Sequence, residues 1–84
     1  MHKIVLSPSA QKFLKKADSI LYERLIKKLK ALAENPFPAD VKRVIGRKDK
    51  VFRVRVGSYR ITYVVYSENN EVLISDIDKR PRIY

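Results

Sequence analysis

Hydrophobic positions in the first half of the chain repeat at the spacing of helices. A short apolar run at residues 2–6 predicts a strand, and Ser7 and Pro8 then form a helix start, with Ser as the N-cap and Pro at the first helical position. The apolar positions that follow lie three or four residues apart and predict the buried side of a first helix: Ala10, Phe13, Leu14 and Ala17.

A second, longer helix is predicted after Asp18 and Ser19, which can cap its start. It should end at Asn35, because a residue before proline avoids the α region of backbone space. One stripe of this helix is apolar, and we expect it to face the core: Tyr22, Leu25, Ile26, Leu29, Leu32 and Ala33.

The second half of the chain alternates between apolar and polar residues, as strands do. Residues 51–56 and 59–66 predict two strands joined by Gly57 and Ser58, a pair suited to a type II′ hairpin turn. Residues 41–45 predict a weaker strand or a turn.

A turn at residues 67–70 leads to a last strand at residues 72–78 and a basic tail at residues 79–84. This order of elements, β-α-α followed by an antiparallel meander, predicts an α+β fold. Its length of 84 residues predicts one domain spanning residues 1–84.

The predicted hairpin places basic side chains opposite one another. A tight turn sets Arg55 against Arg60 and Arg53 against Thr62, all on one face of the ribbon. Directly opposed like charges cost stability, so an anion between them is one interpretation. A solvated outer face, covered by arginine stems, is the other. The opposite face is apolar and should meet the helices: Phe52, Val54, Val56, Tyr59, Ile61 and Tyr63.

The last strand raises a problem of phase. Strict alternation puts Val72 and Ile74 on the core face and gives Arg80 the same parity. A buried arginine is improbable on physical grounds, so either the strand ends near Asp78 or a bulge resets the alternation.

Charge and composition narrow the function. The chain has 19 Lys and Arg against nine Asp and Glu, a formal charge of +10, which favours a polyanionic partner; solubility or a Lys-rich, high-temperature proteome is the plain alternative. It has no cysteine, no long apolar segment and no visible signal peptide, so we expect a cytoplasmic protein with no membrane partner.

The sequence lacks the usual catalytic sets. His2 is the single histidine, and we interpret Asp76 and Asp78 as ion-pair partners of the arginines, so no metal or cofactor is expected. Attack by an RNA 2′-OH on its neighbouring phosphate suits this inventory, because the substrate supplies the nucleophile and the protein supplies positioning and charge. Arginine stays protonated, so the general base is left unassigned.

The hairpin also resembles a known family. Residues 51–63, which read VFRVRVGSYRITY, resemble the central hairpin of the RelE/ParE toxin superfamily, and residues 79–84, KRPRIY, resemble its closing segment. The resemblance implies a type II toxin whose RelE-like members cleave mRNA on the ribosome without a metal. It also implies a set of catalytic residues, and here these fall on Arg53, Arg55, Arg60, Arg80 and Tyr84.

Partners and alternatives follow from the same resemblance. It implies a cognate acidic antitoxin, RelB-like, in addition to the ribosome and its mRNA. Two alternatives are a ParE-like inhibitor of DNA gyrase and a noncatalytic module that binds RNA or the ribosome. Other basic residues around the hairpin and in the tail are predicted to bind RNA: Arg43, Arg47, Lys48, Lys50 and Arg82.

Overall fold

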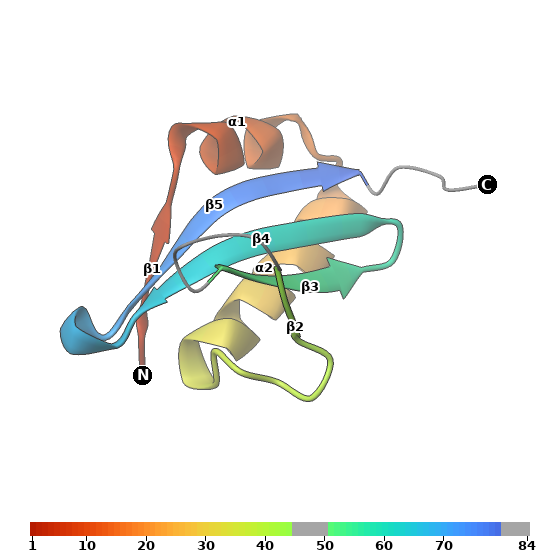
Figure 1. Ribbon diagram of the computed structural model, residues 1–84. Coiled ribbons are helices and arrows are strands. Elements are labelled where there is room, and N and C mark those ends of the chain that lie inside the picture. Colours follow the sequence, from red (N-terminus) through yellow and green to blue (C-terminus); the bar gives the residue numbers. More distant parts are fainter. Residues whose placement is uncertain (45–50, 80–84) are drawn as a thin grey trace.

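The fold is built from one five-stranded sheet and two helices (Figure 1), and the computed structural model describes residues 1–44 and 51–79. The elements in chain order are β1 (Lys3–Leu6), α1 (Pro8–Lys16), α2 (Ser19–Glu34), β2 (Lys42–Arg43), β3 (Val51–Val56), β4 (Tyr59–Tyr66), the 3-10 turn η1 (Ser67–Asn69) and β5 (Glu71–Lys79).

The strands lie in the order β1-β5-β4-β3-β2. The pairs β5–β4, β4–β3 and β3–β2 are antiparallel, and this confirms the predicted α+β fold and its meander. β1 pairs with β5 in parallel, so the first and last strands of the described chain lie side by side at one edge of the sheet (Figure 1). The sequence pattern predicted the strand at residues 2–6 but not this partner.

Both predicted helix starts are confirmed. The Ser7 hydroxyl accepts a hydrogen bond from the Ala10 amide, and the Asp18 carboxylate accepts one from the Leu21 amide. Each cap satisfies an amide that has no partner within its helix. α2 ends at Glu34 with Asn35 as its C-cap, at the predicted position before proline.

One core joins both helices to one face of the sheet. Ala10 and Leu14 of α1 pack with the buried residues of α2 and of the sheet, and α2 lies behind the sheet in Figure 1. The prediction that Tyr22 faces this core is wrong, because its side chain is 45% exposed. Leu21, four residues before Leu25, packs against the core in its place. The largest fully buried side chains are Tyr63, Leu25, Leu32, Ile61, Ile74, Val54 and Val72.

The hairpin has the predicted register. Arg55 pairs with Arg60 and Arg53 pairs with Thr62. Gly57 has a φ of +58°, and Ser58 is not among the residues with positive φ. A positive φ at the first turn position alone is what a type II′ turn requires. The turn therefore fixes which side chains share each face of β3 and β4.

A bulge in β5 solves the phase problem. Thr62 pairs with Asp76 while Tyr63 pairs with Ile74, so Ser75 has no partner in the register. Ile77 is buried with Ile74, and the alternation is thus shifted by one residue between them. Asp76 and the following Asp78 consequently lie on the outer face of the sheet, beside the polar residues of β4.

Neither described helix is long and apolar enough to cross a membrane.

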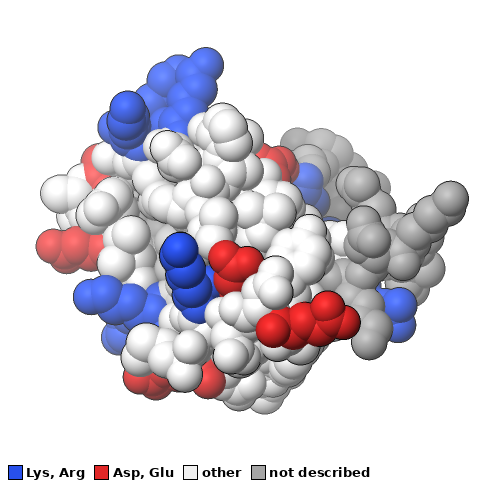
Figure 2. Space-filling view, turned by 90° about the vertical axis from the view of Figure 1, so that its left-hand side faces the viewer, with Lys and Arg blue, Asp and Glu red and all other residues white. Residues whose placement is uncertain are grey.

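Positive charge is also not spread evenly over the molecule. The face in Figure 2 is mostly uncharged, and its Lys and Arg groups are interspersed with Asp and Glu groups. This face does not present the continuous basic surface that a charge of +10 would allow.

Candidate functional site

A pocket opens on the outer face of β3, β4 and β5, the face that neither α1 nor α2 covers. It has a volume of about 270 Å³. We call it the hairpin pocket, and the described residues that line it are Val44, Arg53, Arg60, Thr62, Ser75, Asp76 and Asp78. The strand register places Arg53 and Thr62 on one rung and Arg60 on the next exposed rung. Two of the predicted catalytic arginines are therefore brought together in one pocket.

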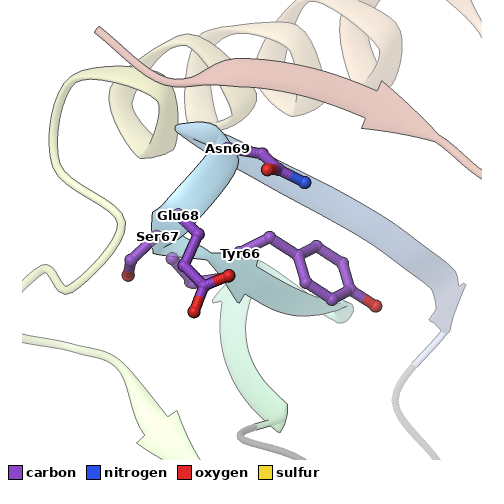
Figure 3. A pocket seen from close by; sticks show the side chains of 5 residues that line it. Tyr66, Ser67, Glu68 and Asn69 are labelled. Atoms are coloured by element: carbon purple, nitrogen blue, oxygen red, sulfur yellow. The ribbon is translucent and has the colours of Figure 1, made fainter.

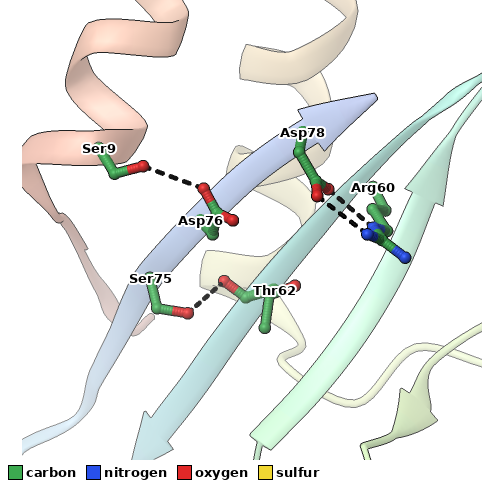
Figure 4. Close-up of polar contacts among 6 residues, drawn as sticks. All are labelled: Ser9, Arg60, Thr62, Ser75, Asp76 and Asp78. Atoms are coloured by element: carbon green, nitrogen blue, oxygen red, sulfur yellow. Dashed lines mark hydrogen bonds and ion pairs between the residues drawn. The ribbon is translucent and has the colours of Figure 1, made fainter. Parts of the chain in front are cut away.

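Arg60 is held by a two-pronged ion pair. Its Nε donates to Asp78 Oδ1 at 2.8 Å, and its Nη2 donates to Asp78 Oδ2 at 3.0 Å (Figure 4). Hydrogen bonding to Asp78 raises the pKa of Arg60 above its ordinary value. The pair fixes the plane of the guanidinium and leaves its Nη1 donors directed elsewhere. The prediction that Asp78 pairs with an arginine is confirmed.

Asp76 has a different partner. The Ser9 hydroxyl of α1 donates to Asp76 Oδ1 at 3.0 Å (Figure 4). The described part of the chain has no Lys or Arg within ion-pair distance of Asp76, so its predicted ion pair is not formed there. Its charge nevertheless acts on Arg60, whose pKa it also helps to raise. Asp76 is thus a carboxylate with one oxygen tethered and the other not tied to a cation.

The bulge that positions these carboxylates is itself anchored. The Ser75 hydroxyl donates to the Thr62 carbonyl at 3.0 Å, and the Ser7 hydroxyl donates to the Ser75 carbonyl at 2.8 Å. The same Ser7 hydroxyl caps α1. The helix start, the bulge and the floor of the hairpin pocket are therefore one connected unit.

Arg55 does not line the hairpin pocket. It lies opposite Arg60 in the register but lines a separate hollow beside α2, together with Arg24 and Lys27. The expectation was that three arginines converge on one anion, but only Arg53 and Arg60 of the three line the hairpin pocket. This separation depends on where the long side chains turn, which strand alternation does not determine.

The remaining predicted residues fall into two groups. Arg43 pairs with Phe52, so it lies on the other face from Arg53, while its neighbour Lys42 pairs with Arg53 and shares its face. Sequence reasoning did not single out Lys42, although the signal was present in the parity of β2. The predictions for Arg47, Lys48, Lys50, Arg80, Arg82 and Tyr84 lie outside the described residues.

A further hollow, apart from these two, has no cationic residue among its described lining residues. It has a volume of about 350 Å³ and is lined by Val65, Tyr66, Ser67, Glu68 and Asn69, where β4 turns into β5 (Figure 3). It lies at the opposite end of β4 from Arg60, and none of its described lining residues is basic. It is therefore unsuited to an anion.

The hairpin pocket combines charges of both signs. Two guanidinium groups and two carboxylates line it, so its described residues have no net charge. Arg53, the open donors of Arg60 and the Thr62 hydroxyl can bind an oxyanion. The carboxylate oxygens can accept hydrogen bonds or act as a base. The pocket can thus hold a phosphodiester and accept a proton from a hydroxyl group beside it.

Comparison with known proteins shows the family of this chain. The sequence profile of the family described as "ParE toxin of type II toxin-antitoxin system, parDE" matches residues 4–84. The chain belongs to the RelE/ParE toxin family. A toxin of this family is the toxin component of a type II toxin–antitoxin system, and the resemblance seen in the hairpin is thereby confirmed.

Relatives of this toxin come from archaea and bacteria. A Methanocaldococcus jannaschii protein named "Putative toxin RelE1" is 39% identical, over 70% of this chain and 72% of that protein. The RelE of the Pyrococcus horikoshii RelE–RelB complex superimposes with a TM-score of 0.85 at 24% identity, over 98% of both chains. Isolated Escherichia coli RelE gives 0.84 at 25% identity, over 99% of this chain and 88% of that one. The fold of this toxin is thus the RelE fold.

Proposed function

We propose that this toxin is an mRNA endonuclease that acts on the ribosome in the cytoplasm and cuts by attack of the RNA 2′-OH, without a metal or other cofactor. The observation that carries the proposal is the joint placement of Arg53 and Arg60 in one pocket with two carboxylates. The solved RelE relatives that match this toxin at 25% identity or more, including the E. coli toxin of the RelBE complex, support it.

The proposed reaction is a displacement at phosphorus by the neighbouring 2′-oxygen of the RNA. The 2′-oxygen gives its proton to a base and bonds to the adjacent phosphorus, and the bond from phosphorus to the 5′-oxygen breaks. The 5′-oxygen takes up a proton from water, so the products are a 2′,3′-cyclic phosphate and a 5′-hydroxyl. Arg53 and Arg60 stabilise the additional negative charge on the phosphoryl oxygens in the transition state. From the family resemblance, Arg80 assists the leaving 5′-oxygen and Tyr84 orients or stacks on the nucleotide.

The pocket also supplies a general base. Among the described residues lining it, Asp76 and Asp78 are the groups whose oxygens can act as a base. Both oxygens of Asp78 are engaged by Arg60, whereas Asp76 is tethered through Oδ1 alone. We therefore propose that Asp76 accepts the proton of the 2′-OH. With Asp76 as the general base, no arginine has to lose its proton.

The experiment is induction of the toxin in cells, followed by primer extension on a translated message. We expect cuts at fixed positions within codons, lost in Arg60→Ala and in Asp76→Asn, and kept in Lys12→Ala, which removes an exposed charge of α1. Asp76→Asn should still bind RNA, because it keeps both arginines. Loss of RNA binding together with cutting would contradict its role as a base.

A second candidate is a ParE-like inhibitor of DNA gyrase, since the matching profile is described as a ParE toxin. In that case messages remain intact after induction and DNA damage appears instead. In either case we propose a RelB-like acidic antitoxin as partner, because RelE of P. horikoshii and of E. coli were each solved with RelB.

A further inference from the structure

A basic pocket lies between α2 and the end of β3, separate from the hairpin pocket. It has a volume of about 510 Å³. We call it the α2 pocket, and the described residues that line it are Arg24, Lys27, Lys28, Ala31, Arg55, Val56 and Gly57. Four of them are cationic and none is acidic, which sets this pocket apart from the electrically balanced hairpin pocket.

The cations of this pocket are poorly compensated. Lys28 is bound to Asp40 at 2.8 Å, but Arg24, Lys27 and Arg55 have no carboxylate within ion-pair distance among the described residues. Arg24 and Lys28 are also four residues apart on one helix, a spacing at which like charges repel. Such an arrangement weakens the free protein and becomes favourable when an anion binds.

Arg24 reaches from α2 to the hairpin turn. A Cβ at Gly57 would stand 2.8 Å from Arg24 Nη2 and 3.4 Å from Nη1, so the guanidinium lies directly against the turn. The absence of a side chain at Gly57 permits this approach.

The chemistry of the pocket favours phosphate. Arginine offers a planar fork that fits phosphate oxygens, and two arginines with a lysine can surround one such group. Arg53 and Arg55 are two residues apart on β3, so their Cα atoms are about 7 Å apart along the strand. This separation is similar to that between neighbouring phosphates of an extended nucleotide chain.

We propose that the α2 pocket binds a backbone phosphate of the same RNA strand, next to the phosphate held by Arg53 and Arg60. This inference rests on the proposed function, which supplies the strand. It changes the role of Arg55, which contacts the neighbouring phosphate rather than the one that is cut. The RNA then crosses β3 from the hairpin pocket toward α2.

The test is the salt dependence of binding to a short, fluorescently labelled single-stranded RNA. For Arg24→Gln/Lys27→Gln we expect weaker binding and a slope of log Kd against log[NaCl] that falls by about 0.7 for each phosphate that the variant no longer neutralises. The matched control is Lys12→Gln/Lys30→Gln, which removes the same charge from exposed positions outside the pocket. Circular dichroism verifies that both variants are folded.

Equal slopes for the two double variants would overturn the inference. It would also be overturned if Arg24→Gln/Lys27→Gln weakened binding to an acidic antitoxin peptide and left RNA binding unchanged. Failure of the proposed function is distinguishable, because it shows as uncut messages during induction while the loss of RNA affinity in Arg24→Gln/Lys27→Gln persists.

Discussion

Tyr63 shows how one buried polar atom joins the sheet to the chain that leaves α2. Its side chain is fully buried, and its hydroxyl donates to the Pro36 carbonyl at 2.7 Å. The ring lies beside Phe52, which in turn contacts Phe37. The connector after α2 is thereby fastened to β4, on the side of the sheet opposite the hairpin pocket.

Replacing Tyr63 tests this link. Tyr63→Phe keeps the ring but leaves the Pro36 carbonyl without its donor, and we expect a loss of about 1–3 kcal/mol in the free energy of unfolding. The measurement is urea denaturation at pH 7. The matched control is Tyr66→Phe, whose side chain is 46% exposed and should change stability by less than about 0.5 kcal/mol. Equal losses in both variants would contradict the role of the buried hydrogen bond.

The same residue predicts a dependence on pH. Burial, and to a lesser extent the charge of Asp40, raise the pKa of Tyr63 above its ordinary value. Above pH ~10 the unfolded chain loses this phenolic proton while the folded protein keeps it. The unfolded state then binds fewer protons, so stability falls as pH rises. We expect a steeper alkaline decline in the wild type than in Tyr63→Phe, and parallel profiles would contradict the shift.

For single residues, the sequence predicted part of the hairpin pocket. The period of two along a hairpin was sufficient to put Arg53, Arg60 and Thr62 on one face. The partner of a long side chain was harder to predict, because it depends on rotamers and on neighbouring strands. The turn of Arg55 toward α2 is one such case. The sequence predicted an arginine partner for Asp78 but not that this arginine is Arg60.

Among the elements, the hairpin turn sets the register of the candidate site. Gly57 has a φ of +58°, a region in which a residue with a Cβ is strained by roughly 1–2 kcal/mol. An added Cβ also meets Arg24 Nη2 at 2.8 Å, but this is the end of a flexible side chain and can move away. Backbone strain is therefore the larger of the two effects.

We expect Gly57→Ala to lower the free energy of unfolding by about 1–2 kcal/mol. Gly57→Asn should lower it less, because asparagine tolerates positive φ better than alanine while displacing Arg24 in the same way. The midpoint of urea denaturation measures both. If the two variants lose equal stability, contact with Arg24 rather than backbone strain determines the cost.

The elements were predicted well where the signal is local. Caps, the proline stop and the type II′ turn depend on a few adjacent residues, and each is found where the sequence placed it. The parallel pairing of β1 with β5 joins residues almost 70 positions apart, as the contact between Ser7 and Ser75 illustrates, and no local pattern encodes it. The bulge at Ser75 was foreseen as one way to restore the phase, but its position comes from pairing with β4.

At the scale of the whole molecule, the excess of positive charge favours negatively charged binding partners. The formal charge is +10, yet the described residues form two ion pairs, Lys28 with Asp40 and Arg60 with Asp78. Most of the cations in residues 1–44 and 51–79 therefore have no ion-pair partner there. An RNA strand and an acidic antitoxin would both relieve this repulsion, so we expect them to compete for the protein.

The same excess predicts how salt affects the free protein. Its principal extents are 34 × 30 × 25 Å, similar to the screening length of about 30 Å at 0.01 M salt, so at that concentration each charge interacts with charges across the molecule. At 0.1 M the screening length is about 10 Å, and the long-range repulsion is mostly removed.

Raising NaCl from 0.01 to 0.1 M should therefore stabilise the protein, because it screens many repulsive pairs but weakens few attractive ones. We expect the urea midpoint to rise over this interval and to rise equally in KCl, since screening does not depend on the identity of the cation. A falling midpoint would mean that attractive pairs such as Arg60 with Asp78 outweigh the repulsion. In that case the positive charge would be balanced within the fold, and the electrostatic basis for two phosphate sites on the hairpin would be lost.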